Sequence, residues 1–196
     1  MNNILEAESQ KLLNAVRGLL TAKGITSPAE IAGRIAITNQ ASPERGARMV
    51  AKAWTEPEFR KLLLADGTRA AVSLDIPMRG LPPLGVLENT PEVHNLVVCT
   101  LCSCYPRAVL GMPPFWYKSA AYRARAVRDP RGVIAEWGTM LPDGVKIRVV
   151  DSTADYRWMV LPRRPRGTET WNADQLAAIV REGDMIGVTV PPLPAT

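Results

Sequence analysis

Apolar residues recur at intervals of three and four through the first 75 residues, a spacing that predicts amphipathic helices. Helix-start signals divide this stretch. Ser27, Pro28 and Glu30 combine a capping hydroxyl, a proline at the first helical position and an acid three residues after the cap. Short helices of this kind cannot each bury a face alone, so they must pack against other parts of the protein. The predicted helices begin near residues 2, 28, 43, 57 and 68, and the fourth is expected to stop at Gly67.

The pattern changes after Pro77. The stretch "IPMRGLPPLGV", residues 76–86, predicts a linker or an extended crossing, and the apolar run 93–99 predicts a buried strand. Further strands are expected at 145–150 and 156–161, joined as a hairpin through "DSTAD". The remaining predictions are helices at 119–127, at 129–137 and from Asn172 to Gly183, and a last strand in "MIGVTV".

The order of these elements predicts an α+β protein. We expect a helical N-terminal arm over 1–76, packing on a partner subunit, and an α+β catalytic domain over 77–196. The 196 residues are enough for one domain with an arm and too few for two full domains.

The charge and the hydropathy of the chain limit the classes of function that we expect for it. The 24 basic and 19 acidic residues leave a net charge of +5, which permits nucleic-acid binding without requiring it. The arginines at 123–131 and at 163–166 lack interleaved aromatic residues, so a solvated face or a surface for an acidic partner subunit is the preferred interpretation. No window is apolar enough to span a membrane, and the acidic N-terminal segment is unlike a signal peptide. We therefore expect a cytoplasmic protein that binds neither nucleic acid nor membrane.

The stretch "VVCTLCSCYP" contains all three cysteines of the chain, Cys99, Cys102 and Cys104. An odd number of cysteines argues against a disulfide framework and favours metal or redox chemistry. Structural zinc and iron–sulfur sites need a fourth ligand. The only histidine, His94, would point to the other face of the strand that leads to Cys99.

Backbone nitrogen offers another way to complete the ligand set. Two thiolates one residue apart, at Cys102 and Cys104, would press the amides of Ser103 and Cys104 against a shared ion. An acidic trivalent ion could displace the amide protons. Three sulfurs and two nitrogens would then leave one position open for a substrate or water.

The cysteine stretch, with "ENTPEVHN" before it and "VLGMPPFWYKSAAYRARAVRDPR" after it, resembles the α subunit of nitrile hydratase, in a family that includes thiocyanate hydrolase. The later "MVLPRRPRGTETWNADQLAAIV" resembles the same family, so the resemblance covers residues 48–188. It implies a layered α/β/β/α metal-binding domain. It also implies metal binding by the sulfurs of Cys99, Cys102 and Cys104 and by the backbone nitrogens of Ser103 and Cys104.

The resemblance further implies that Cys102 is a sulfinic acid and Cys104 a sulfenic acid. Thr100 matches the cobalt members, so cobalt(III) is expected ahead of iron(III). The implied reaction is hydration of a nitrile to an amide, with the Cys104 sulfenate or an activated water as nucleophile; both remain open. The Ser103 hydroxyl either hydrogen-bonds an oxidised sulfur or is only a small filler. The implied partners are one or two β-type subunits that supply arginines to the oxidised cysteines, and a metallochaperone or activator.

Arg107 departs from the family pattern, in which tryptophan is usual at this position, and looks more like thiocyanate hydrolase. A cation there favours a polar or anionic substrate, such as a nucleoside nitrile. The alternatives are therefore a thiocyanate hydrolase subunit and, from another class, a non-catalytic thiol redox or metal sensor. We expect His94 to be a packed or interface residue, and Arg164 to be either an interface brace or a plain surface charge.

Overall fold

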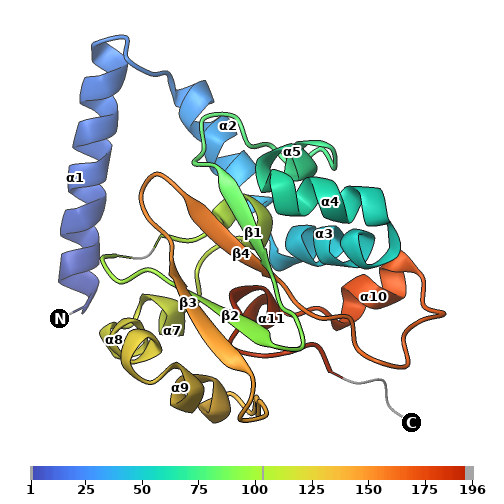
Figure 1. Ribbon diagram of the computed structural model, residues 1–196. Coiled ribbons are helices and arrows are strands. Elements are labelled where there is room, and N and C mark those ends of the chain that lie inside the picture. The colour runs from blue at the N-terminus through green and yellow to red at the C-terminus, as the bar shows by residue number, and fades with distance from the viewer. Residues whose placement is uncertain (1, 103, 193–196) are drawn as a thin grey trace. The chain divides into compact units, whose positions relative to one another are not determined.

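The computed structural model describes residues 2–102 and 104–192, and the chain divides into two compact units, Met1–Gln40 and Ala41–Thr196 (Figure 1). None of the helices in these described ranges has both the length and the apolar character that a bilayer crossing needs. The second unit begins at Ala41, whereas the sequence placed the domain boundary at 76. The helices that follow Ala41 therefore belong to the main body of the protein.

The first unit consists of α1 (Asn2–Ala22) and α2 (Pro28–Asn39). The capping box at Ser27 is confirmed: the Glu30 amide donates to the Ser27 hydroxyl at 3.2 Å, and the Ser27 amide donates to the Glu30 carboxylate at 2.7 Å. Several large apolar side chains of this unit are exposed, and α2 has no buried residue. Those exposed by more than two-fifths are Leu12, Leu13, Val16, Leu19, Ile25, Ile35 and Ile37.

The second unit mixes helices and strands, which confirms the α+β prediction (Figure 1). Its strands are β1 (Leu84–Glu88), β2 (Val93–Val98), β3 (Lys146–Asp151) and β4 (Arg157–Leu161). Its helices are α3 (Pro43–Thr55), α4 (Pro57–Ala65), α5 (Gly67–Val72), α6 (Arg107–Leu110), α7 (Phe115–Lys118), α8 (Ala120–Arg128), α9 (Pro130–Glu136), α10 (Ala173–Ile179) and α11 (Glu182–Ile186).

The four strands form two parallel pairs, β1 with β4 and β2 with β3. The predicted hairpin between β3 and β4 is therefore wrong. Asp151 pairs with Val98 and Arg157 with Leu84, so the five residues between β3 and β4 carry the chain from one strand pair to the other. From the sequence, β1 was assigned to a linker, because this short strand follows two prolines, contains Gly85 and lacks an alternation of polar and apolar residues.

Helices cover both strand pairs. Helices α4 and α5 pack on β1, α8 on β2 and α9 on β3, while α11 contacts both β2 and β4. The last three residues of β2 and of β4 are almost fully buried: Leu96, Val97, Val98, Met159, Val160 and Leu161. The carboxyl end of β2, which leads directly into the cysteines, thus lies in the buried core.

The predicted last strand is also wrong, and the last helix does not run to Gly183. Helix α10 ends at Ile179, and a separate helix, α11, contains Met185 and Ile186. The Asp184 carboxylate accepts the Arg181 amide at 2.8 Å and caps this new turn of helix. Gly187 then ends the helix in the left-handed region, with φ of 90°.

His94 is a buried packing residue with 3% of its surface exposed. Its Nε2 lies 2.7 Å from the Gly187 carbonyl oxygen, and its Nδ1 lies 3.2 Å from the Asn89 side-chain nitrogen. An amide nitrogen can only donate, so Nδ1 accepts and Nε2 carries the proton. Both ring nitrogens are thus used within the chain.

We expect His94 to reduce stability at mildly acidic pH. Burial lowers the pKa of His94, against a smaller raising effect of its bond to Gly187. Below pH about 6.5, His94 therefore binds a proton in the unfolded chain more readily than in the folded chain. The free energy of unfolding consequently falls as the pH drops below that value. Urea unfolding between pH 5.5 and 7.5 measures this loss. A His94→Gln variant should lose less stability over the same range, and an equal loss would contradict the assignment.

Candidate metal centre

The cysteine loop is anchored to the core at its first residue. The Tyr122 hydroxyl donates to the Val97 carbonyl at 2.7 Å, and the Ser152 amide donates to the Val98 carbonyl at 2.7 Å. These bonds fix the end of β2, and Cys99 follows directly, with 1% of its surface exposed. The chain therefore leaves the sheet with its first thiol already buried.

The three thiols converge, and none of them forms a disulfide. Their sulfur atoms all lie within 4.8 Å of one another, with 3.5 Å between Cys99 and Cys102 and 3.2 Å between Cys102 and Cys104. With metal–sulfur bonds of about 2.3 Å, ligands at right angles lie about 3.3 Å apart, and tetrahedral ligands about 3.8 Å apart. The spacing fits neighbouring positions of an octahedral ion better than a tetrahedral zinc site.

The three thiols differ in exposure. Cys99 and Cys104 are buried, and Cys102 is exposed. Burial first, and then hydrogen bonds with Cys102 and Cys99, raise the pKa of the Cys104 thiol to about 12, against the opposing charge of Arg157. A metal must displace this proton to bind the sulfur, so metal binding at this loop releases protons.

Thr100 is held from two sides. Its amide donates to an Asp151 carboxylate oxygen at 3.1 Å, and its hydroxyl donates to the other oxygen of the same carboxylate. The Arg123 guanidinium donates to the Thr100 carbonyl at 3.3 Å. Asp151 ends β3 and Arg123 lies on α8, so two other elements fix the residue that follows the first cysteine.

We expect Asp151→Asn to weaken metal binding about 10-fold to 100-fold, as changes next to metal ligands typically do. Asparagine offers one acceptor oxygen where the carboxylate accepts two donors from Thr100. Metal content after dialysis against a graded chelator measures the change. Asp155→Asn, in the exposed turn after β3, is the matched control, and equal metal retention in both variants would contradict the role of Asp151.

Tyrosines support the far side of the loop. The Tyr117 hydroxyl donates to the Cys104 carbonyl at 2.8 Å, and its ring meets the Tyr105 ring edge-on at a centroid distance of 4.9 Å. The Tyr105 hydroxyl donates to the Glu182 carboxylate, and burial raises the pKa of both groups. Tyr105 is thus a buried part of the core, and Trp116 packs on Tyr122 and Trp137.

A small cavity of about 110 Å³ lies beside Tyr105. Its walls are mostly apolar, and Arg107 and Arg157 are its two charged residues. Arg107 is exposed and Arg157 half-buried. The predicted ligands Cys99, Cys102 and Cys104 are thus brought together next to a cavity with two cations, whereas His94 lies at the opposite end of β2, and Ser103 lies outside the described residues.

Comparison with known proteins agrees with this geometry. Residues 7–189 match the family described as nitrile hydratase, alpha chain. The chain is 48% identical to the low-molecular weight cobalt-containing nitrile hydratase subunit alpha of Rhodococcus rhodochrous, over 93% of this chain and 89% of the relative. The chain belongs to the nitrile hydratase α family.

Two solved structures show that the fold of this nitrile hydratase α chain is shared across metal types and activities. A recombinant thiocyanate hydrolase comprising partially modified cobalt centres superposes with a TM-score of 0.87 at 44% identity, over 93% of this chain and 89% of the other. A double mutant of the Fe-type nitrile hydratase from Comamonas testosteroni Ni1 superposes with 0.84 at 40% identity, over 97% of both chains. The family relationship alone therefore supports cobalt without excluding iron.

Proposed function

We propose that this chain is the catalytic α subunit of a cobalt(III) nitrile hydratase, which converts a nitrile to the corresponding amide. The observation that carries the proposal is the convergence of three sulfurs within 4.8 Å on one loop anchored to the core. The cobalt-containing relative supports the choice of metal.

The sulfurs of Cys99, Cys102 and Cys104 and the backbone nitrogens of Ser103 and Cys104 would hold the ion. The bound ion would supply a Lewis acid with one open position. The chain itself fixes the geometry: Asp151 and Arg123 hold Thr100, and Tyr117 holds the carbonyl of Cys104. These bonds hold Thr100 and the Cys104 carbonyl in position without a metal.

We infer that Cys102 is the sulfinic and Cys104 the sulfenic acid of the active enzyme. Exposure of Cys102 leaves its sulfur open to oxidant, whereas burial of Cys104 fits a lower oxidation state. Cys104, as the sulfenate or as a group that orients water, and Ser103 are the proposed catalytic residues. The related thiocyanate hydrolase with partially modified cobalt centres supports a modification of the metal centre here as well.

Oxidised sulfurs carry negative charge, and that of buried Cys104 in particular needs cationic donors. Arg157 acts electrostatically on Cys104, and a single guanidinium cannot balance two oxidised sulfurs. We propose that one or two β-type subunits supply further arginines, and that an activator loads the metal in the cytoplasm. The exposed apolar side chains of α1 and α2 support packing of the N-terminal arm on such a partner.

The cavity beside Tyr105 supports a polar or anionic substrate. Arg107 and Arg157 place two positive charges around its apolar walls, next to the residue that follows Cys104. The two cations favour a nitrile with a polar body, such as a cyano-substituted nucleoside, over a simple aliphatic nitrile, and a cavity of about 110 Å³ would hold only part of that body. Thiocyanate is the second candidate substrate, favoured by the same two cations and by the related thiocyanate hydrolase.

The deciding experiment is a parallel assay of the cobalt-loaded enzyme with its partner subunits. A cyano-substituted pyrrolopyrimidine nucleoside, acrylonitrile and thiocyanate are offered at equal concentration. Amide formation from the nucleoside nitrile, faster than from acrylonitrile, is the expected result. Turnover of thiocyanate alone would assign the chain to the second function. No turnover of any of the three, with thiols that cycle between oxidation states, would favour the redox sensor.

Arg107→Trp should separate the polar from the apolar substrates. We expect kcat/KM for the polar nitrile to fall about 10-fold to 100-fold, because the variant leaves a polar group of the substrate unpaired. The kcat/KM for acrylonitrile should stay the same or rise, and the metal content of the enzyme should not change. Lys118→Trp, an exposed cation outside the cavity, is the matched control. Equal losses on both nitriles would remove Arg107 from substrate recognition.

A further inference from the structure

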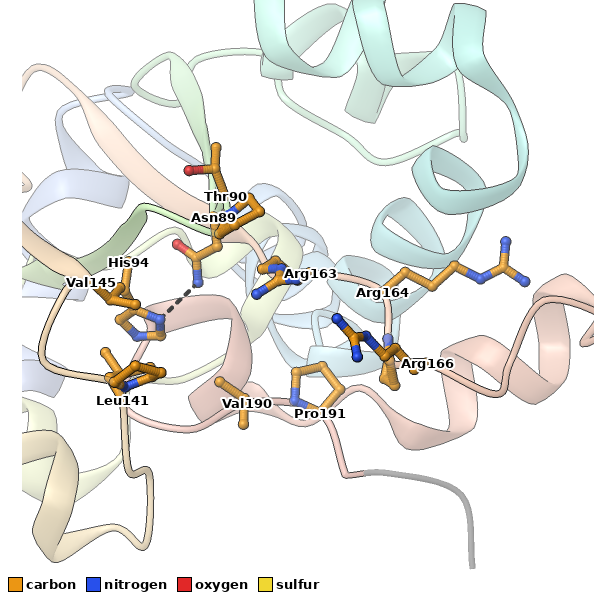
Figure 2. Close-up of a pocket in the computed structure, with 13 residues that line it drawn as sticks. Asn89, Thr90, His94, Leu141, Val145, Arg163, Arg164, Arg166, Val190 and Pro191 are labelled. Atoms are coloured by element: carbon orange, nitrogen blue, oxygen red, sulfur yellow. Dashed lines mark hydrogen bonds between the residues drawn. The ribbon is translucent and has the colours of Figure 1, made fainter.

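A larger cavity, of about 350 Å³, lies away from the cysteine loop (Figure 2). It lies at the beginning of β2, whereas Cys99 follows the end of the same six-residue strand. At about 3.3 Å per residue, some 20 Å separates the two sites. The cavity is therefore distinct from the proposed metal centre and its substrate pocket. Its walls come from Asn89–Pro91, His94, Leu141, Pro142, Val145, Arg163–Arg166, Val190 and Pro191.

The charged side chains that line this cavity are arginines. Arg163, Arg164 and Arg166 line it, and no acidic side chain is among the 13 described residues of its wall. Within the part of the chain that the structure describes, these arginines form no ion pair of 4.0 Å or less; the six ion pairs found there use other residues. The pKa of Glu169 is lowered mainly by backbone hydrogen bonds and only weakly by Arg164. Among the described residues, these three neighbouring arginines thus have no ion-paired counter-ion.

Arg164 fixes the loop that carries the other two arginines. Its guanidinium donates to the Trp54 carbonyl at 3.1 Å, to the Thr168 hydroxyl at 3.2 Å and to the Thr168 carbonyl. All three acceptors are uncharged, and Figure 2 shows the Arg164 side chain extending away from His94. The loop is therefore tied to α3, while Arg163 and Arg166 are exposed and have no hydrogen bond to the described residues that engages their guanidinium groups.

The opposite wall is rigid and neutral. Asn89 binds His94 and also accepts the Asn95 amide at 2.7 Å, so the polar atoms of this wall are used within the chain. Figure 2 shows the bond between Asn89 and His94 at the edge of the cavity. The rest of the wall is mostly apolar, from Leu141, Pro142, Val145, Val190 and Pro191. A ligand would thus meet cations on one side and carbon on the other.

We propose that this cavity binds a carboxylate with an apolar body. The planar guanidinium groups of Arg163 and Arg166 match the two oxygens of a carboxylate, and the proline and aliphatic walls accept its hydrocarbon part. The volume is at the lower end of the range for small-molecule pockets. The carboxylate belongs either to a free organic acid or to an acidic side chain or chain end of the partner subunit.

Titration calorimetry with benzoate tests the proposal on the full-length chain and on its complex with the partner subunits. Benzoate should bind the chain, and Arg163→Ala/Arg166→Ala should weaken binding at least about 10-fold. Benzoate that binds at the metal centre instead would bind this variant unchanged. Arg79→Ala/Arg128→Ala removes the same charge from exposed positions outside the cavity and should bind like the wild type.

Two further probes sharpen the result. Benzamide, without the charge, and inorganic phosphate, without the apolar body, should both bind at least about 10-fold more weakly than benzoate. Benzoate binding to the chain and to the complex would identify a free acid as the ligand; binding to the chain but not to the complex would identify a carboxylate of the partner. No binding to the chain, equal binding of benzamide or phosphate, or an unaffected arginine variant would overturn the proposal.

Discussion

Cys104→Ala is expected to remove the metal centre and to reduce nitrile hydration by more than about 100-fold, beyond what changes next to metal ligands cost. Cys104 would supply both a sulfur and a backbone nitrogen to the ion, and alanine cannot supply the sulfur. The cavity left by one small side chain should cost little stability, because the backbone bond from Tyr117 remains. Metal analysis and the hydration rate of the complex with partner subunits measure the two effects.

Leu101→Ala is the matched control for metal content. Leu101 lies in the same loop with 86% of its surface exposed and has no ligand atom. This variant should therefore keep one metal per chain. A Cys104→Ala protein that retains full metal content would show that the sulfur is not a ligand, and it would also remove the physical basis of the proposed chemistry.

Gly187→Ala should produce the largest loss of stability, more than about 3 kcal/mol, because backbone strain and a backbone clash combine. A Cβ at Gly187 would lie 2.0 Å from the carbonyl oxygen of Asn95 and 3.2 Å from the Cα of Leu96, both in the buried strand β2. The φ of 90° adds strain for any residue with a side chain. Urea unfolding of the full-length chain gives the free energy of unfolding of each variant.

Two other glycines separate the strain from the clash. Gly138 has a φ of 80°, and a Cβ at this position would have no neighbouring atom within 4 Å, so Gly138→Ala should lose only about 1 to 2 kcal/mol, the cost of the backbone conformation. Gly144 also has open space and no positive φ, so Gly144→Ala should change stability by less than about 1 kcal/mol. A Gly187→Ala loss no larger than that of Gly138→Ala would contradict the close approach of α11 and β2.

Local signals in the sequence predicted most helices well. Ser27 and Asn172 cap helices through residues three positions further on, and Ser42 precedes a helix without a side-chain cap bond. Strand pairing depends on distant segments. The short connection after Asp151 suggested a hairpin, but β3 and β4 each pair in parallel with an earlier strand, and no local pattern records that choice.

The residues of the candidate site also fall into those that the local sequence predicted and those that only the fold brings together. Three cysteines within six positions must lie close together, and their spacing together with the family resemblance predicted a metal centre. The residues that hold their loop, Asp151, Tyr117 and Arg123, come from β3, α7 and α8 and were not predicted as a set. Of the two cations of the small cavity, Arg107 was predicted, because it lies soon after the cysteines in sequence. Arg157 was not predicted, because it reaches the site only through the pairing of β4 with β1.

The most direct test of the proposed metal centre is metal analysis of the purified protein together with peptide mass spectrometry across residues 97–106. The proposal predicts one cobalt per chain, two added oxygens on Cys102 and one on Cys104 after coexpression with the partner subunits in cobalt medium. Zinc in the site, or three unmodified thiols without metal under the same conditions, would contradict it.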